Sequence, residues 1–342
     1  MGLNHRWSFS KFPRANLGIW PTPIQRLDRL GEQLKRRDIY IKRDDLTGLG
    51  QGGNKTRSLE FLLGDAVKNG ADIVLTAGGL QSNLCSLTAA ACCKLGLDCL
   101  LVHNDNKPDK LEGNMLLNSV FGAKSIFVGR IDEQHRTREM ERLAGQMRRE
   151  GRNAYVVHNG ASTSLGALGY ANAAFELYDQ IKAQGLTIKH VGIVGAMGGT
   201  ASGFVLGAAL LGHPFHVHVI SVEYPEPVLS RILSELIAGA SEIAKEVQGI
   251  EPQVAPATVM TIYDEYLGEG YGIPTARSRR SLFELAQTEG ILLEDVYTSK
   301  SLGGFLDLIQ KGDIPPGEGA CYIHTGGLGS LFAQDILRLP GS

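Results

Sequence analysis

The sequence has no long uninterrupted apolar segment of the kind that crosses a membrane. Its most apolar stretch, residues 204–222, contains three histidines and Pro214, which makes it too polar to span a bilayer. The first residues, MGLNHRWSFSKF, lack the apolar core of a secretion signal. Arg6 breaks the myristoylation pattern, which needs Ser or Thr at that place. We therefore expect a soluble cytoplasmic protein that does not bind membranes.

The sequence also lacks an excess of either charge. Its 34 basic side chains nearly balance 36 acidic ones, for a net charge of −2, so no overall field favours nucleic acid or an anionic membrane. The five cysteines are an odd number without paired CxxC units, which is neither a zinc pattern nor a disulfide framework. We expect reduced thiols, no metal, and a small molecule as the partner.

Short apolar runs that are typical of strands alternate with segments whose apolar residues recur at helical spacing. This alternation predicts an α/β fold with a mostly parallel, doubly wound sheet. The chain of 342 residues is long enough for two domains. We expect a large domain from residues 1–60 and 166–342, with a small domain, residues 61–165, inserted in it. The predicted strands are residues 39–42, 72–77, 99–103, 125–128, 154–158, 190–194, 216–223 and 320–324.

Glycine is abundant, and many of the 43 glycines gather in four places. These clusters lie in residues 48–53, 78–79, 195–203 and 326–329, and three of them directly follow a predicted strand. A single cluster can simply make a tight turn between a strand and a helix. Because ligands of doubly wound sheets bind at the carboxyl ends of the strands, several clusters at one edge predict a binding site.

The segment Gly52-Gly-Asn-Lys-Thr-Arg57 places a lysine at the predicted start of a helix. It is not a P-loop, because Leu49 and Asn54 stand where that pattern needs glycine. Burial of Lys55 beside the positive end of the helix dipole would lower its pKa and favour the neutral amine that a Schiff base needs. The alternative is a solvated lysine at a helix start.

The segment Gly78-Gly-Leu-Gln-Ser-Asn83 leads from a predicted strand into a predicted helix. Side-chain oxygens, amides and free backbone N–H groups at such a place can hold a carboxylate. Ser82 or Asn83 could instead serve only as helix caps.

A third turn, in residues 191–203, joins a buried strand to a helix of small residues. Backbone N–H groups of Gly198, Gly199 and Thr200 would form a cradle for a phosphate monoester. A dinucleotide turn is the rival interpretation, because Glu223 ends the next strand, where a ribose-binding acid would lie.

Taken in order, GGNKTR, GGLQSN, GAMGGT, GYGIP, DVYTSK and IHTGG resemble motifs of the family of D-cysteine desulfhydrase and 1-aminocyclopropane-1-carboxylate deaminase. The resemblance runs from about Phe12 to the C-terminus. It implies a fold-type II pyridoxal-phosphate enzyme, with two doubly wound, mostly parallel sheets that carry helices on both faces. It also implies that pyridoxal 5'-phosphate is the cofactor and that the chain forms a homodimer.

The resemblance implies a cofactor site made by several of these motifs. Lys55 would hold the cofactor as a Schiff base and then take the proton from the substrate Cα. The other implied cofactor contacts are Asn54, Asn83 at the 3' oxygen, Gly198, Gly199 and Thr200 at the phosphate, and Thr325 at the pyridine nitrogen.

For a small amino-acid substrate, the resemblance implies that Gln81, Ser82 and Asn83 hold the carboxylate, assisted by Ser162. Phenols can bond a substrate or transfer a proton, although most tyrosines are packing residues. The implied catalytic side chains are Lys55, Ser82, Tyr271 and Tyr297.

Thr298, which we expect to contact the substrate, bears on the choice of substrate. In the cyclopropane deaminases a glutamate follows this tyrosine, whereas the desulfhydrases have a threonine, so the sequence is more similar to the desulfhydrases. The implied reaction is β-elimination from D-cysteine, which yields pyruvate, ammonia and sulfide. L-cysteate with a sulfite leaving group, the cyclopropane substrate, and a nicotinamide-dependent oxidoreductase stay open as alternatives.

The sequence departs from the family at two places. The relatives commonly continue after Gln-Ser-Asn with His and then Arg-Gln, whereas this chain has Leu84-Cys-Ser86. Ser58 stands where a basic residue near the phosphate is usual. These differences predict an altered pocket shape and a phosphate site that relies on backbone amides.

Overall fold

The computed structural model describes residues 9–336. Their strands are β1 (Ile24–Arg26), β2 (Ile39–Arg43), β3 (Ile73–Gly78), β4 (Asp98–His103), β5 (Lys124–Phe127), β6 (Ala154–Val157), β7 (His190–Gly195), β8 (His216–Ser221), β9 (Met260–Tyr263) and β10 (Ala320–His324). Their α-helices are α1 (Asp28–Gln33), α2 (Lys55–Lys68), α3 (Asn83–Leu95), α4 (Gly113–Val120), α5 (Glu133–Arg149), α6 (Ser164–Gln184), α7 (Gly199–Leu210), α8 (Glu226–Gln248), α9 (Ala276–Glu289), α10 (Thr298–Lys311) and α11 (Leu328–Leu331).

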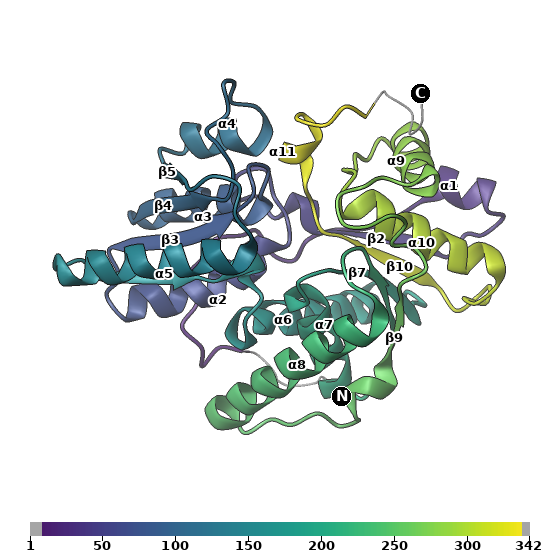
Figure 1. Cartoon of the computed structure of the whole chain (residues 1–342). Coiled ribbons are helices and arrows are strands. Elements are labelled where there is room, and N and C mark those ends of the chain that lie inside the picture. The colour runs from purple at the N-terminus through teal and green to yellow at the C-terminus, as the bar shows by residue number, and fades with distance from the viewer. Residues whose placement is uncertain (1–8, 337–342) are drawn as a thin grey trace.

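These strands form two separate sheets (Figure 1). The six-stranded sheet has the order β1-β2-β10-β7-β8-β9, and the four-stranded sheet has the order β5-β4-β3-β6. Within the described residues every strand pair is parallel except β1 with β2. The structure thus confirms the predicted α/β fold with two mostly parallel sheets.

The six-stranded sheet is buried on both faces, because alternate side chains of each strand point to opposite sides. On one face, Val191 and Ile193 of β7 join a hydrophobic core with α6, α7 and α8. On the other, Ala320 and Tyr322 of β10 join a second core with α9 and α10. Helices therefore cover both faces of this sheet.

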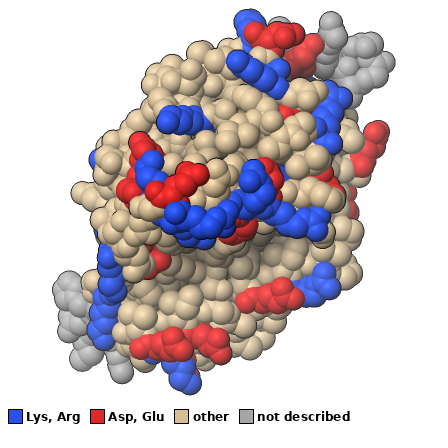
Figure 2. Space-filling model, turned by 60° about the vertical axis from the view of Figure 1, so that its left-hand side comes forward, with Lys and Arg blue, Asp and Glu red and all other residues tan. Residues whose placement is uncertain are grey.

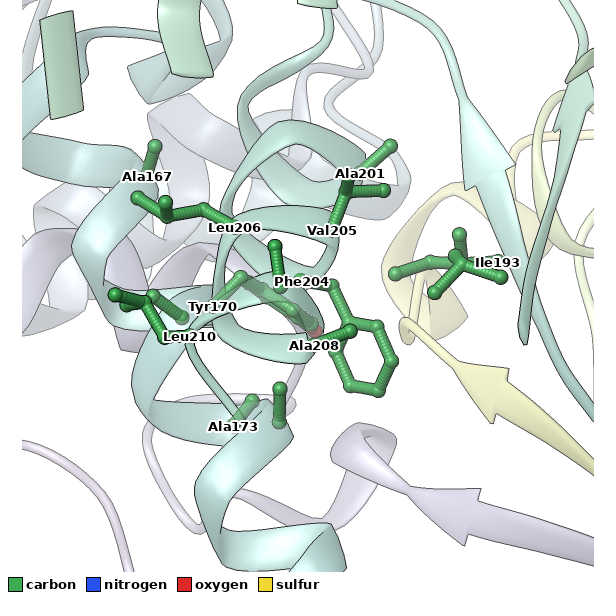
Figure 3. Close-up of a cluster of buried hydrophobic side chains, with 14 of the residues drawn as sticks. Ala167, Tyr170, Ala173, Ile193, Ala201, Phe204, Val205, Leu206, Ala208 and Leu210 are labelled. Carbon is green, nitrogen blue, oxygen red and sulfur yellow. The ribbon is translucent and has the colours of Figure 1, made fainter. Parts of the chain in front are cut away.

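Small residues bring α6 and α7 unusually close together behind the sheet (Figure 3). A Cβ at Gly203 would lie 1.9 Å from the carbonyl oxygen of Ala167, and one at Gly207 would lie 2.5 Å from that of Ala171. Glycine is therefore required on this side of α7. The tight packing holds α7 rigidly, and its first residues are Gly199 and Thr200.

The four-stranded sheet is also covered on both faces. Val74 of β3 faces a core with α2 and α3, whereas Leu75 faces a core with α5. All four strands fall inside the predicted small domain, residues 61–165. Helix α2 crosses the predicted boundary at residue 60, because Phe61 packs in the core of the large sheet and Leu62 in that of the small sheet. The domain boundaries themselves stay a prediction.

Two strands of the large sheet were not predicted from the sequence. They are β1, with three residues, and β9, with four. Both lie at an edge of the sheet, where half of each strand's hydrogen bonds are made and a short segment suffices. The other eight strands lie within two residues of their predicted bounds.

Basic and acidic side chains lie close together on the surface. On the face in Figure 2, basic and acidic side chains gather in one band across the molecule, with mostly uncharged surface on either side. Among residues 9–336, none of the helices has both the length and the apolar character needed to cross a membrane.

A buried ionic cluster anchors the first turns of α2. The guanidinium of Arg57 forms two hydrogen bonds with Asp44, at 2.7 and 2.8 Å, and two more with Glu176. Thr22 and Tyr170 donate hydroxyls to Asp44, which is fully buried. Although burial opposes the charged form, Arg57 holds the pKa of Asp44 at about 2. Both members of the pair therefore stay charged, and the start of α2 is fixed.

We expect Asp44→Ala to lower the free energy of unfolding by about 3–5 kcal/mol, because it leaves the buried guanidinium of Arg57 without its main partner. Equilibrium unfolding in urea measures the change. Asp28→Ala is the control, since the Asp28–Arg26 pair is largely exposed and its loss should change stability by less than about 1 kcal/mol. Equal losses in the two variants would contradict the anchoring role.

Candidate active site

A cavity of about 500 Å³ lies at the carboxyl ends of both sheets. Its walls include the residues that follow β3, β4, β7, β8 and β10, which is where parallel sheets bind ligands. Most residues predicted for the site line this cavity. They are Asn54, Lys55, Gln81, Ser82, Asn83, Ser162, Gly198, Gly199, Thr200, Tyr271, Tyr297 and Thr325.

Lys55 is the first residue of α2 and lines the cavity. Its Nζ donates a hydrogen bond of 2.7 Å to the carbonyl oxygen of Gly160. Burial lowers the pKa of Lys55 to about 8, and the nearby carboxylate of Glu223 opposes the shift only in part. A much larger fraction of this amine is therefore neutral near pH 7 than for a solvated lysine. The alternative of a solvated lysine is wrong.

Asn54 connects three loops of the site. Its side-chain amide donates to the hydroxyl of Thr200 at 2.9 Å, and its backbone N–H donates to the carbonyl oxygen of Thr325 at 2.9 Å. These two bonds hold the starts of α2 and α7 beside the end of β10. The lysine and the glycine turn, 143 positions apart at Lys55 and Gly198, therefore border the same cavity.

The turn before α7 has the form of an anion cradle. Gly198 has φ +87°, and a Cβ there would lie 2.8 Å from Ile232, so only glycine fits. A Cβ at Gly199 would lie 2.9 Å from Ser162. The backbone N–H of Gly199 donates to the Ser162 hydroxyl at 3.2 Å. Free N–H groups and the positive end of the helix dipole suit this turn to a phosphate group.

The start of α3 faces the cavity from the small sheet. The Ser82 hydroxyl caps the helix by accepting from the backbone N–H of Cys85 at 3.3 Å. The side-chain oxygen of Asn83 accepts from the Asn114 amide at 2.8 Å. Capping by Ser82 is compatible with anion binding, because one cap leaves other N–H groups of the first turn free for a carboxylate.

The side chain of Gln81 has a positioning role. Its oxygen accepts from the backbone N–H of Asn114 at 2.8 Å, and its amide donates to the carbonyl oxygen of Glu112 at 3.1 Å. These bonds tie the loop before α3 to the beginning of α4. Leu84 lines the cavity beside it, whereas Ser58 is buried in α2 and does not.

The phenol side chains of Tyr271 and Tyr297 form another part of the cavity wall. The hydroxyls of Tyr271 and Tyr297 are hydrogen-bonded to each other. Burial raises the pKa of Tyr271 to about 12, and burial together with the neighbouring phenol raises the pKa of Tyr297 further. Both therefore carry their protons at neutral pH and can donate one to a group in the cavity.

Thr298 does not line the cavity, although the sequence predicted a contact with the substrate. It is the first residue of α10 and only 1% exposed. Its hydroxyl hydrogen-bonds Glu294, donating to a carboxylate oxygen at 3.1 Å. Side chains at a helix start point back toward the preceding turn, so Thr298 can act on the cavity only through Glu294.

Glu294 was not predicted as a site residue, yet it lines the cavity. Its carboxylate accepts the backbone N–H groups of Val296, Tyr297 and Thr298. Burial raises its pKa, while these bonds act in the opposite direction. Glu294 thereby fixes the backbone of Tyr297. The sequence feature that could have indicated this role is a carboxylate four residues before the start of a helix.

The chain matches known proteins over most of its length. A family model described as "Pyridoxal-phosphate dependent enzyme" matches residues 15–326. The chain belongs to this family. Pyridoxal phosphate is accordingly its cofactor, and a buried amine opposite a glycine cradle is the donor set that this aldehyde and its phosphate require.

Named relatives fall into two groups. The chain is 38% identical over 323 residues to a putative 1-aminocyclopropane-1-carboxylate deaminase of Pyrococcus horikoshii, covering 94% of each chain. It is 33% identical over 339 residues to the D-cysteine desulfhydrase of Serratia proteamaculans, covering 97% of this chain and 98% of the relative. The enzyme is thus a pyridoxal-phosphate enzyme of this deaminase and desulfhydrase group.

Solved structures agree with this assignment. An ACC deaminase homologue superposes with a TM-score of 0.85 at 37% identity, covering 95% of this chain and 94% of the other. O-ureido-L-serine synthase gives a TM-score of 0.65 at 16% identity, covering 94% of both chains, which shows a shared fold alone. The fold is therefore that of a fold-type II pyridoxal-phosphate enzyme.

The lowered pKa of Lys55 predicts how cofactor capture depends on pH. Only the neutral amine attacks an aldehyde, so the rate at which cofactor-free protein captures pyridoxal phosphate should rise with pH. The rise should level off above about 8, and stopped-flow absorbance measures it. A midpoint at the ordinary value of 10.5 would contradict the burial of the amine.

Glu223→Gln provides a directional check. It removes the carboxylate that raises the pKa of Lys55, so the midpoint should move to lower pH. Glu235→Gln, on the exposed side of α8, is the control and should leave the midpoint unchanged.

Proposed function

We propose that the enzyme catalyses β-elimination from a small β-substituted amino acid, with D-cysteine as the reference substrate and sulfide as the leaving group. One observation carries this proposal. A lysine amine whose pKa is lowered to about 8, a helix start suited to a carboxylate, and a pair of protonated phenols border the same cavity.

Lys55 is the proposed base. Pyridoxal phosphate, when bound, supplies an electron sink that makes the Cα–H of an amino acid acidic. The Lys55 amine, freed on exchange with the substrate amine, takes this proton. Its lowered pKa increases the fraction of the amine in the neutral form that a base needs, and the carbonyl of Gly160 orients it.

The beginning of α3 is the proposed site for the substrate carboxylate. Ser82, Asn83 and the free N–H groups of the first turn supply the donors. Gln81 holds this loop against α4. Fixing the carboxylate here orients the rest of the substrate toward Lys55, which removes much of the entropic cost of reaching the reactive geometry.

The tyrosine pair is the proposed proton donor to the leaving group. As the Cα–H bond breaks, its electrons form a double bond between Cα and Cβ, and the bond between Cβ and sulfur breaks toward sulfur. A proton from the Tyr297 and Tyr271 pair neutralises the departing sulfide. Water then hydrolyses the released enamine to pyruvate and ammonia.

Ring opening of 1-aminocyclopropane-1-carboxylate is a second candidate, because relatives at 38% identity bear that name. The buried carboxylate of Glu294 also lies in the cavity wall, although Thr298 occupies the position where the cyclopropane deaminases have glutamate. The two reactions differ in their products, since ring opening gives a four-carbon keto acid and β-elimination from cysteine gives pyruvate.

Purified enzyme should release pyruvate and sulfide from D-cysteine, as measured by coupled reduction of the keto acid. Lys55→Ala should abolish both products and the absorbance of bound cofactor, because it removes the attachment point and the base. Lys68→Ala, exposed at the far end of the same helix, is the control and should retain activity. Release of a four-carbon keto acid from 1-aminocyclopropane-1-carboxylate, with no pyruvate from D-cysteine, would favour ring opening.

Tyr297→Phe should lower kcat on the order of a hundredfold, because it removes a positioned proton donor but keeps the aromatic ring. A better leaving group, such as the chloride of β-chloroalanine, needs less protonation. The decrease in kcat for that substrate should therefore be much smaller. Steady-state pyruvate release measures both. Tyr178→Phe, on the outer part of α6, is the matched control. Equal losses for both substrates would remove Tyr297 from this role.

A further inference from the structure

Arg136 is a buried cation in the cavity wall to which neither the sequence nor the proposed reaction gives a role. It lies in the first turn of α5, on the buried stripe that continues through Met140 and Ala144. Those two residues pack in the core between α5 and the small sheet. Arg136 is only 5% exposed, yet it lines the cavity near Gly78 and Ser82.

The guanidinium of Arg136 has few partners among residues 9–336. Its Nη1 donates to the side-chain oxygen of Asn104 at 2.8 Å. Its Nη2 lies 4.0 Å from a carboxylate oxygen of Glu133, which is too far for a hydrogen bond. Its Nε has no partner within the described part of the chain. A buried guanidinium with unused donors is costly unless an acceptor completes its bonding.

Glu133 does not complete the bonding of this cation. The Glu133 side chain is 46% exposed, against 7% for Arg136, so water screens its charge. Its carboxylate also accepts a hydrogen bond from Asn159. The Glu133–Arg136 interaction therefore leaves most of the positive charge of Arg136 uncompensated.

Two other titratable groups that interact with Arg136, Cys85 and His103, carry no negative charge. Burial raises the pKa of the Cys85 thiol to about 12, so it stays protonated. Burial also lowers the pKa of His103, which keeps the ring neutral. His103 accordingly bonds the carbonyl oxygen of Gly78 and the Ser125 hydroxyl instead of a charged partner.

Arg136 bonds Asn104, which follows β4, the strand next to β3 in the small sheet. In the register of the small sheet, Gly78 of β3 pairs with His103 of β4, so Asn104 follows β4 beside the turn that leads to Ser82. Neighbouring strands are about 4.8 Å apart. Because Arg136, Asn104 and the start of α3 line one cavity, two anion sites there can hold the two acidic ends of a three-carbon amino acid.

We propose that Arg136 and Asn104 form a second anion subsite, which binds an oxyanion on the β-carbon of the substrate. This inference rests on the proposed β-elimination. The substrates that this subsite favours are alanines whose β-substituent is a sulfonate or a phosphate ester, while the start of α3 takes the α-carboxylate.

The subsite also serves the leaving step. The proton on Cα passes to Lys55, the Cα–H electrons form the double bond to Cβ, and the β-substituent departs with the electrons of its own bond. Sulfite or phosphate then leaves as an anion, and the Arg136 guanidinium stabilises the charge that grows on it. Arg136 is thus a residue that determines specificity.

The test measures pyruvate release by the holoenzyme from three substrates, each as both enantiomers. Cysteate and O-phosphoserine carry a β-oxyanion, and β-chloroalanine does not. Arg136→Met should lower kcat/KM for the two oxyanion substrates at least about tenfold more than for β-chloroalanine, as expected for loss of a charge-assisted hydrogen bond. The selective loss of kcat/KM in Arg136→Lys should lie between that of Arg136→Met and the wild type, because lysine keeps the charge but not the planar fork.

Two further variants separate this effect from a general loss of structure. Arg138→Met removes an exposed charge from the same helix and should behave as wild type. Asn104→Asp keeps the side-chain shape but places a carboxylate against Arg136. This carboxylate should compete with the substrate oxyanion and reproduce the selective loss.

Binding provides a readout without catalysis. 3-Sulfopropanoate has both acidic groups but no amine, so it cannot react. Calorimetry should show that it binds the wild-type holoenzyme, and that Arg136→Met weakens this binding about tenfold. Propanoate, which lacks the sulfonate, should be affected much less.

Equal losses for all three substrates would place Arg136 at the α-carboxylate and overturn the proposal. Turnover of β-chloroalanine but of neither oxyanion substrate by the wild type would also overturn it. If no substrate yields pyruvate, the proposed β-elimination fails, and 3-sulfopropanoate binding then decides the subsite alone.

Discussion

The hydrogen bond from Asn54 to Thr200 joins the parts on which the site depends. It holds the beginning of α2 against the beginning of α7, and the backbone of Asn54 adds a bond to Thr325 at the end of β10. The amine of Lys55 and the glycine cradle face one cavity because of these two contacts. Behind them, the buried pairing of Arg57 with Asp44 fixes the first turn of α2 to the large sheet.

Much of the fold could be predicted because its signals are local. Central strands are buried on both faces and appear as continuous apolar runs, such as residues 190–194 and 320–324. The glycine turn at Gly198 needs a positive φ that only glycine adopts without strain. The edge strands β1 and β9 have no such signal, since they are short and only partly buried.

The candidate site could be predicted where its residues follow a strand and not elsewhere. Ser82 and Thr200 stand in turns after strands, so their place at the edge of a sheet follows from the order of elements. Thr298 was assigned to the cavity by resemblance, but the direction of its side chain depends on the turn before α10. The sequence could not show that direction.

Arg136 illustrates a different limit. It lies among the many charged residues of α5, where one more arginine looks like part of a solvated face. Its spacing of four and eight residues from Met140 and Ala144 places it on the same side of the helix as those two residues. That this side is buried becomes clear only in the structure, where α5 packs against β3 and β4.

The two sheets contribute different walls to one cavity. The glycine cradle belongs to loops of the six-stranded sheet, whereas Ser82, Asn104 and Arg136 belong to the four-stranded sheet. Helices α2 and α6 both contribute side chains to the two cores. Substitutions in the smaller sheet can therefore reshape one wall of the cavity during evolution, while the glycine cradle of the larger sheet stays unchanged.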